Sequence, residues 1–298
     1  MLDFSNRPLV IGHRGARGLY PENTIDGFSR ALALGVEAIE LDVAVTADGI
    51  LVVTHDLRLN PDIVRGADGR WLEPPTPRVR DLTFDQLSRY DVGRLRPGSA
   101  YARCFPEQQA EDGARTPSLQ EVLSLDPRLP LLVEMKTSPA EPDLTVRPDE
   151  MAELVVDAVN AAGAISRSMI LAFDWRGLRD LQRQHPQVAT GWLTQPMDDA
   201  ERRLWWGDEL GACVGHSAAR AIAEQGGRCW LPELAGVRKP EITAAQLLGL
   251  WVIPWNVESR EDIARALAGG VDGLITDRPD LALEFRAARK RSASAGGA

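Results

Sequence analysis

Short apolar runs rich in β-branched residues recur along the chain and alternate with segments of helical periodicity. Apolar runs bounded by turn residues indicate buried strands, and their alternation with helices is typical of a parallel sheet built from βα units. Eight runs predict barrel strands, over Leu9–Gly12, Ala38–Val43, Leu131–Glu134, Met169–Phe173, Thr190–Leu193, Ala212–Gly215, Val252–Trp255 and Gly273–Thr276. Eight strands with intervening helices are the number that a (β/α)₈ TIM barrel requires, and this α/β architecture is the predicted fold.

Helix signals fill several of the intervals between these runs. Apolar residues at helical spacing predict helices over Asn23–Leu34, Glu150–Ala162 and Glu261–Ala268. Thr24 is the candidate N-cap of the first helix. A further helix is expected over Ser118–Leu125, because its opening Ser-Leu-Gln-Glu matches a capping box.

One apolar run does not fit the βα alternation. Only Thr46–Gly49 separates Val45 from Ile50, and a parallel crossover needs about a dozen residues. We therefore expect an antiparallel hairpin with Asp-Gly in the turn, which makes Leu51–Thr54 an accessory strand outside the barrel.

The register of this hairpin follows from the position of its turn. A turn centred on the Ala47–Asp48 bond pairs Glu40 with His55 and Asp42 with Val53. Directly paired residues share a face of the sheet, and so do residues two apart on one strand. Glu40, Asp42 and His55 are therefore predicted to share one face at one end of the hairpin.

The segment 57–116 has a different composition from the rest of the chain. It is rich in Pro, Gly, Arg and Asp with weak periodicity, and it contains one predicted short helix, Thr83–Tyr90. We interpret it as an insertion over one face of the barrel and a candidate lid. The barrel domain is expected to span 1–286, and the basic, then Ser/Ala/Gly-rich tail 287–298 is predicted to be disordered.

Composition narrows the partners of the protein. The chain of 298 residues carries a net charge of −9, which argues against a nucleic-acid partner. The three cysteines form neither a zinc pattern nor a disulfide framework, so a reducing compartment is expected. Residues 1–8 lack the pattern of a signal segment, and no apolar stretch approaches the roughly 20 residues of a spanning helix. These features predict a soluble cytoplasmic protein without stable membrane insertion.

The ends of the predicted strands carry most of the chain's candidate chemistry. Barrel enzymes place their reacting groups at the C-terminal ends of the strands. Those ends and the hairpin return supply two histidines, three carboxylates and two cations, namely His13, Arg14, Glu40, Asp42, His55, Glu134 and Lys136. Asp56 directly follows one histidine and is expected to orient or cap the loop after His55, and Asp277 ends the last strand.

This set of side chains suits a metal-assisted hydrolase of a phosphoester. Three carboxylates at one mouth repel each other unless a hard cation lies between them, and oxygen ligands favour Mg²⁺ or Ca²⁺ over Zn²⁺. The histidines are then free for proton transfer, because imidazole titrates near neutrality. Arg14 and Lys136 add positive charge that would stabilise a phosphoryl group.

Seven pieces of the chain together resemble the glycerophosphodiester phosphodiesterase family. They are His13-Arg14-Gly15, Pro21-Glu22-Asn23-Thr24, Glu40-Leu41-Asp42, Asp48-Gly49, His55-Asp56, Glu134-Met135-Lys136 and the run from Val271 to Pro279. The resemblance spans nearly the whole chain and includes the insertion that follows His55. It implies a TIM-barrel enzyme that hydrolyses a small-molecule glycerophosphodiester, such as glycerophosphocholine or glycerophosphoethanolamine, to glycerol 3-phosphate and an alcohol.

The resemblance also implies a role for each matching residue. Glu40, Asp42 and Glu134 match the metal ligands, and His13 and His55 match the acid–base pair. By the same resemblance, Arg14 and Lys136 contact the phosphate. The family's late Trp-Thr-Val-Asn pattern reads Trp255-Asn256-Val257-Glu258 here, so Trp255 is kept as a candidate substrate wall while the neighbouring polar residues differ.

Several alternatives stay open at this point. Lys136 could be a structural counter-ion, and sequence does not order the two histidines as base and acid. The nucleophile is either water or the glycerol hydroxyl beside the phosphate. A lysophospholipase D- or phospholipase C-like enzyme acting on lipid phosphodiesters is a neighbouring interpretation, and a non-catalytic barrel that binds a phosphorylated ligand is a rival of another class. The sequence does not predict the alcohol, the oligomeric state or which of the two metal ions, Mg²⁺ or Ca²⁺, is used in vivo.

Overall fold

The computed structural model describes residues 7–211 and 217–295, with residues 289–295 described only as helix backbone. Within these residues, parallel pairing joins eight strands in the order β8-β7-β6-β5-β4-β2-β1-β9. Their bounds are β1 Leu9–His13, β2 Ala38–Val45, β4 Leu131–Met135, β5 Ser168–Ala172, β6 Ala189–Thr194, β7 Cys229–Pro232, β8 Trp251–Val252 and β9 Gly273–Thr276. Backbone hydrogen bonds from Asp272 to Val252 and from Ile275 to Pro254, at 2.9 and 3.0 Å, join the two ends of this series. The predicted (β/α)₈ TIM barrel is confirmed.

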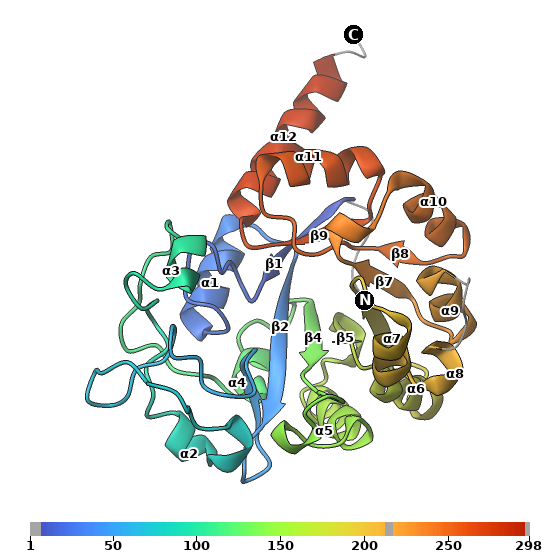
Figure 1. The fold of residues 1–298 in the computed structure, drawn as a ribbon. Coiled ribbons are helices and arrows are strands. Elements are labelled where there is room, and N and C mark those ends of the chain that lie inside the picture. The colour runs from blue at the N-terminus through green and yellow to red at the C-terminus, as the bar shows by residue number, and fades with distance from the viewer. Residues whose placement is uncertain (1–6, 212–216, 296–298) are drawn as a thin grey trace.

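Helices surround the strands on the outside of the barrel (Figure 1). The described helices are α1 Ile25–Leu34, α2 Phe84–Leu87, α3 Ala100–Cys104, α4 Leu119–Leu123, α5 Pro148–Ala161, α6 Trp175–Gln184, α7 Asp199–Trp206, α8 Asp208–Gly211, α9 Ala218–Glu224, α10 Lys239–Leu247, α11 Arg260–Gly269 and α12 Pro279–Ala295. Of these, α2 and α3 belong to the insertion. The helices predicted within 23–34, 118–125, 150–162 and 261–268 correspond to α1, α4, α5 and α11. None of the described helices is both long and apolar enough to cross a membrane.

The barrel strands separate two hydrophobic layers. Along β1, Leu9 and Ile11 belong to the cluster inside the barrel, whereas Val10 belongs to the larger cluster between strands and helices. This alternation follows from the period of two along a strand. Because both layers are apolar, the strands appear in the sequence as nearly continuous hydrophobic runs.

The predicted helix starts are present in the structure. The Thr24 hydroxyl accepts a hydrogen bond from the amide of Gly27 at 3.0 Å, which caps α1. Ser118 and Glu121 form the capping box of α4, in which each side chain accepts from the other's backbone amide. These caps satisfy amides that the first helical turn leaves without partners.

The place of the sixth barrel strand, β7, differs from the prediction. The run Ala212–Gly215 lies outside the described residues, and the strand between β6 and β8 is Cys229–Pro232, paired to Gly191 on one side and Trp251 on the other. The predicted run 212–215 and the segment of β7 are both short in the sequence. Pro232, at the end of β7, weakens the strand signal of that segment. The predicted strand 252–255 is also shorter, because Pro254 cannot donate to a ladder.

The hairpin forms as predicted, but its register differs by one residue. β3 is Leu51–Val53, and Val43 pairs with Val53 where the sequence paired Asp42 with that residue. The cause is a loop with one more residue, closed by the Thr46 amide on the Ile50 carbonyl and containing Gly49 at φ 78°. The predicted direct pairing of Glu40 with His55 is therefore wrong, and His55 reaches the barrel mouth from the loop beyond β3.

The insertion lies beside β2 and α1, on the side of the barrel away from α10 (Figure 1). It has its own hydrophobic cluster, which includes Leu59, Ile63 and Leu87 and packs against Ala44 and Val52 of the hairpin. Its predicted helix appears as the shorter α2, and α3 was not predicted. A packed cluster makes the insertion an ordered part of the fold, while its movement as a lid stays a prediction.

The C-terminal segment is more regular than expected. α12 begins at Pro279 and continues through Ala295, so helical backbone covers residues 287–295 of the tail, whose disorder stays a prediction. Alanine, arginine and lysine are good helix formers, and their propensity favours the continuation of the helix.

Candidate active site

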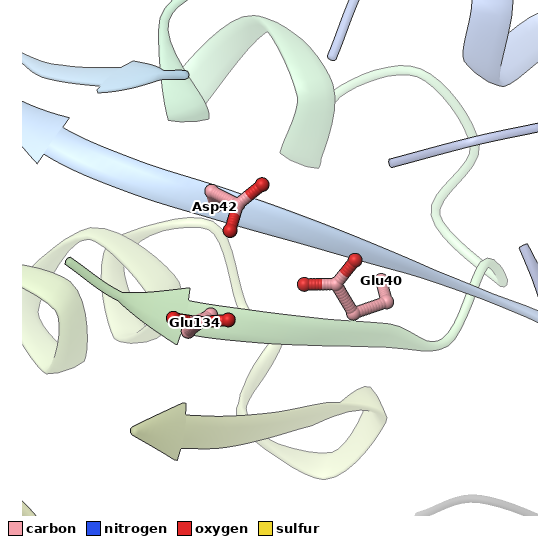
Figure 2. Close-up of side chains that lie close together, drawn as sticks. All are labelled: Glu40, Asp42 and Glu134. Carbon is pink, nitrogen blue, oxygen red and sulfur yellow. The ribbon is translucent and has the colours of Figure 1, made fainter. Parts of the chain in front are cut away.

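Three carboxylates gather where two neighbouring barrel strands end. Glu40 and Asp42 lie two residues apart on β2, and the parallel register places Asp42 beside Glu134 of β4. One oxygen from each residue lies within 4.8 Å of the others, and all three residues are buried. Figure 2 shows these carboxylates over the two adjacent strands, as the shared-face prediction for Glu40 and Asp42 required.

The electrostatics of this cluster fit a hard cation. Burial, together with the charges of Asp42 and Glu134, raises the pKa of Glu40 well above its usual value. A raised carboxyl pKa means that the ionised form lacks sufficient compensating positive charge. Oxygen donors in a buried cluster are the ligands that Mg²⁺ and Ca²⁺ prefer, so the residues present could hold a divalent metal ion.

His13 ends β1 next to this cluster. Its Nε2 lies 3.8 Å from a carboxylate oxygen of Glu40, and its Nδ1 lies 2.6 Å from Asp277 at the end of β9. Burial lowers the pKa of His13 to about 4 although Asp277 opposes the shift. A neutral ring that donates from Nδ1 to Asp277 leaves Nε2 as an acceptor facing the carboxylates.

His55 lines the same small cavity as His13. Its Nδ1 lies 2.7 Å from Asp56, whose second oxygen accepts from Asn60 at 2.9 Å. Burial would raise the pKa of Asp56, but its hydrogen bonds with His55 and Asn60 keep that pKa below its usual value. With its side chain 35% exposed, His55 is far more open to solvent than His13 at 9%.

Arg14 reaches the carboxylates because of an unusual backbone conformation. Its φ of 49° lies in the left-handed region, which a non-glycine residue adopts at a cost. Its amide donates to Glu40 at 3.1 Å, its Nε lies 3.1 Å from Asp42, and its guanidinium donates to Glu22 at 2.8 Å. The neighbouring Gly15, at φ 95°, completes this turn.

Lys136 is the second cation of the mouth. Its ammonium lies 2.7 Å from Glu134 and 3.5 Å from Asp42. It therefore contacts the carboxylate cluster, as the counter-ion interpretation requires, and it also lines the cavity beside His13 and His55. Contact with a substrate phosphate stays a prediction for both Lys136 and Arg14.

A small cavity of about 70 Å³ connects these groups, with both histidines, Glu40 and Glu134 among its lining residues. Trp255 and Phe173 form its apolar wall, with their rings edge to face at 5.2 Å. A larger cavity of about 560 Å³ also contacts His55, Glu134, Lys136 and Phe173 and extends toward the insertion. The mouth thus offers a small chamber lined by charged and apolar side chains, and a wider space next to it.

Sequence reasoning missed a second layer of contacts around these groups. Asp277 was noted only as a strand end, although its partner His13 lies 264 positions away. Arg17 binds both oxygens of Asp277, at 3.0 and 2.8 Å, and Glu22 joins Arg14 to Tyr101 of α3. Charged residues within the turn after β1 were the available signal, but their partners depend on barrel closure.

Comparison with known proteins identifies the family. The profile of the glycerophosphoryl diester phosphodiesterase family matches residues 13–281. A glycerophosphodiester phosphodiesterase from Caldanaerobacter subterraneus is 30% identical over 286 residues, covering 94% of this chain and 98% of the relative. One from Bacillus altitudinis is also 30% identical, covering 93% and 97%.

Solved structures agree with the sequence relatives. The crystal structure of a putative glycerophosphoryl diester phosphodiesterase from Silicibacter pomeroyi superposes with a TM-score of 0.87 at 35% identity, covering 96% of this chain and 95% of that one. An Oleispira antarctica phosphodiesterase, solved in complex with the product sn-glycerol-3-phosphate, shares the fold with a TM-score of 0.67 at 18% identity, covering 93% and 96%. The match over nearly the full length shows that this chain belongs to the glycerophosphoryl diester phosphodiesterase family of enzymes.

Proposed function

We propose that this protein hydrolyses glycerophosphodiesters such as glycerophosphocholine or glycerophosphoethanolamine to glycerol 3-phosphate and an alcohol. The observation that carries the proposal is the convergence of both histidines, Glu40 and Glu134 on one small cavity, with Asp42 completing the buried cluster of carboxylates. The Oleispira phosphodiesterase was solved with sn-glycerol-3-phosphate as its product, which supports the same substrate class. The negative net charge does not oppose an anionic substrate, because the local field of the mouth governs its binding.

We assign the divalent cation, Mg²⁺ or Ca²⁺, to Glu40, Asp42 and Glu134. When bound, this ion would neutralise charge on the phosphoryl oxygens. Arg14 and Lys136 lie against the same carboxylates, and we assign them to the phosphate as well. Positive charge held in a partly buried mouth stabilises a phosphoryl transition state more strongly than the same charge in water.

The two histidines would share the proton transfers. Asp277 and Asp56 each bind the Nδ1 of one ring, so that the Nε2 atoms are available for the reaction. One imidazole would remove a proton from the nucleophile, either water or the glycerol hydroxyl next to the phosphate. The other would donate a proton to the departing alkoxide.

A panel of glycerophosphodiesters tests this proposal, with each product alcohol identified and lysophospholipid included as a separate substrate. We expect release of glycerol 3-phosphate from at least one deacylated diester. His13→Ala and His55→Ala should each lower turnover by about 10²–10⁴-fold, while His185→Ala, a half-buried histidine paired with Glu153, should not. Full activity of His55→Ala, or hydrolysis of lysolipid alone, would reject the assignment.

A further inference from the structure

The insertion contacts two residues of the turn after β1, Glu22 and Arg17, through the side chain of Tyr101 on α3. The Tyr101 hydroxyl donates to one carboxylate oxygen of Glu22 and accepts from the guanidinium of Arg17 at 3.2 Å. Arg17 is held further by the Phe105 ring, 4.7 Å from its guanidinium carbon, and by Gln108, which donates to its carbonyl at 2.8 Å. α3 and the loop after it therefore support the turn that follows β1.

Two chains of hydrogen bonds lead from this hydroxyl to the proposed reacting groups. In the first, the other oxygen of Glu22 accepts from Arg14 at 2.8 Å. In the second, Arg17 binds Asp277 through two nitrogens, and Asp277 holds Nδ1 of His13 at 2.6 Å. The residues of both chains between Tyr101 and the mouth are buried, so water cannot readily replace a lost partner.

We propose that Tyr101 is a positioning residue that fixes the Arg14 guanidinium and the His13 imidazole together, and so makes the geometry of the mouth depend on the docked insertion. The inference rests on the proposed function for the roles of Arg14 and His13. A buried network in which every member has a partner holds one arrangement rigidly, whereas a missing member leaves a buried group unsatisfied. Without the hydroxyl, Glu22 loses a donor and Arg17 loses an acceptor.

The substitution Tyr101→Phe isolates the hydroxyl. It keeps the aromatic ring, which packs edge to face on Phe105 at a centroid distance of 5.1 Å. Tyr90→Phe is the matched control, because Tyr90 is a half-buried tyrosine of the same insertion that, in the described part of the chain, contacts neither Glu22 nor Arg17. Melting temperatures of both variants equal to that of the wild type would show that the fold of the insertion is kept.

Kinetics form the first readout of the test. We expect Tyr101→Phe to lower kcat/KM by about tenfold, the lower range for partners that orient a reacting group. KM should rise through Arg14 and kcat should fall through His13, while Tyr90→Phe leaves both constants unchanged. Combined with Arg17→Lys, the loss in kcat should be smaller than the product of the single losses, because both changes act on His13 through one chain.

The ring nitrogens of His13 supply a readout that does not depend on turnover. Their NMR resonances should shift in Tyr101→Phe and stay unchanged in Tyr90→Phe. If the wild-type protein hydrolyses no diester, the proposed function fails, and the His13 spectrum still decides whether Tyr101 positions the ring. Unchanged His13 resonances in Tyr101→Phe, or losses in kcat that simply multiply in the double variant, would overturn the inference.

Discussion

Asp277 lies between His13 and Arg17 and determines how the buried imidazole can act. Burial would raise the pKa of Asp277, but its contacts with His13 and Arg17 outweigh burial and hold that pKa below its usual value. An ionised carboxylate on Nδ1 keeps the proton on that nitrogen and directs Nε2 toward the mouth. Orientation of His13 therefore depends on a residue that does not itself face the carboxylate cluster.

Replacing Asp277 should impair catalysis more than substrate binding. We expect Asp277→Asn to lower kcat by about 10–100-fold with a smaller change in KM, because the amide can bind His13 in the wrong tautomer. Asp272→Asn is the matched control, since Asp272 is another buried carboxylate bound by an arginine, Arg7, outside the cavity. Steady-state kinetics of the two variants check this, and equal effects of both would contradict a specific role for Asp277.

The side chains that face the mouth could be predicted from the sequence, whereas their supports could not. His13, Glu40 and Glu134 follow apolar runs directly, so the rule that barrel strands end at one mouth is enough to bring them together. The contact of Asp277 with Arg17 requires β9 to lie beside β1, and that of Tyr101 with Glu22 requires the insertion to fold back. Neither contact has a local signature.

The helices and turns show the same division between local and distant causes. Capping predicted the start of α4 correctly, because Ser118 and Glu121 satisfy each other within one turn. The hairpin register was wrong by one residue, because Asp48-Gly49 is compatible with loops of two lengths and the longer one places Gly49 in the left-handed region. Local chemistry thus predicts that a turn forms but does not determine its length.

The capping box of α4 offers a direct test of local stabilisation. We expect Ser118→Ala to lower the free energy of unfolding by about 1 kcal/mol, the usual value of a lost N-cap. Ser124→Ala, at the other end of α4, removes an exposed hydroxyl that donates to the Gln120 carbonyl. This change should alter the free energy of unfolding by less than about 0.5 kcal/mol. Urea unfolding measures the free energy of unfolding of both variants. Equal losses would mean that the capping hydroxyl of Ser118 stabilises the protein no more than the exposed hydroxyl of Ser124.

The barrel as a whole was predictable because the fold follows from the number of apolar runs. Misplacing one of these runs leaves that number unchanged. β7 lies at Cys229–Pro232, and the run predicted for that strand, 212–215, lies outside the described residues, yet eight barrel strands are present in the described part of the chain. The ordered insertion and the length of α12 were not predictable, since the first depends on packing against the hairpin and the second on helix propensity in a polar tail.

Acid should destabilise the molecule partly through Asp277. Its pKa is lower in the folded chain than the value of about 3.9 in an unfolded chain. Its stabilising contribution is therefore complete above that unfolded value and is lost as the pH falls through the folded one. We expect the free energy of unfolding of Asp277→Asn to be lower than that of the wild type by about 3 kcal/mol at pH 7. This difference between variant and wild type should be smaller at pH 3. Urea unfolding at both pH values measures it, and an unchanged gap would show that the carboxylate charge is not what stabilises the fold.

Calorimetric titration of Mg²⁺ and Ca²⁺ into chelator-treated protein, with glycerophosphocholine hydrolysis followed on the same samples, tests the proposed metal-dependent mouth most directly. The account predicts saturable binding that restores turnover, and Glu134→Gln should weaken binding and lower turnover by at least about tenfold. Glu153→Gln, on the outer helix α5, should match the wild type. Full turnover in excess EDTA, with Glu134→Gln indistinguishable from wild type, would contradict the account.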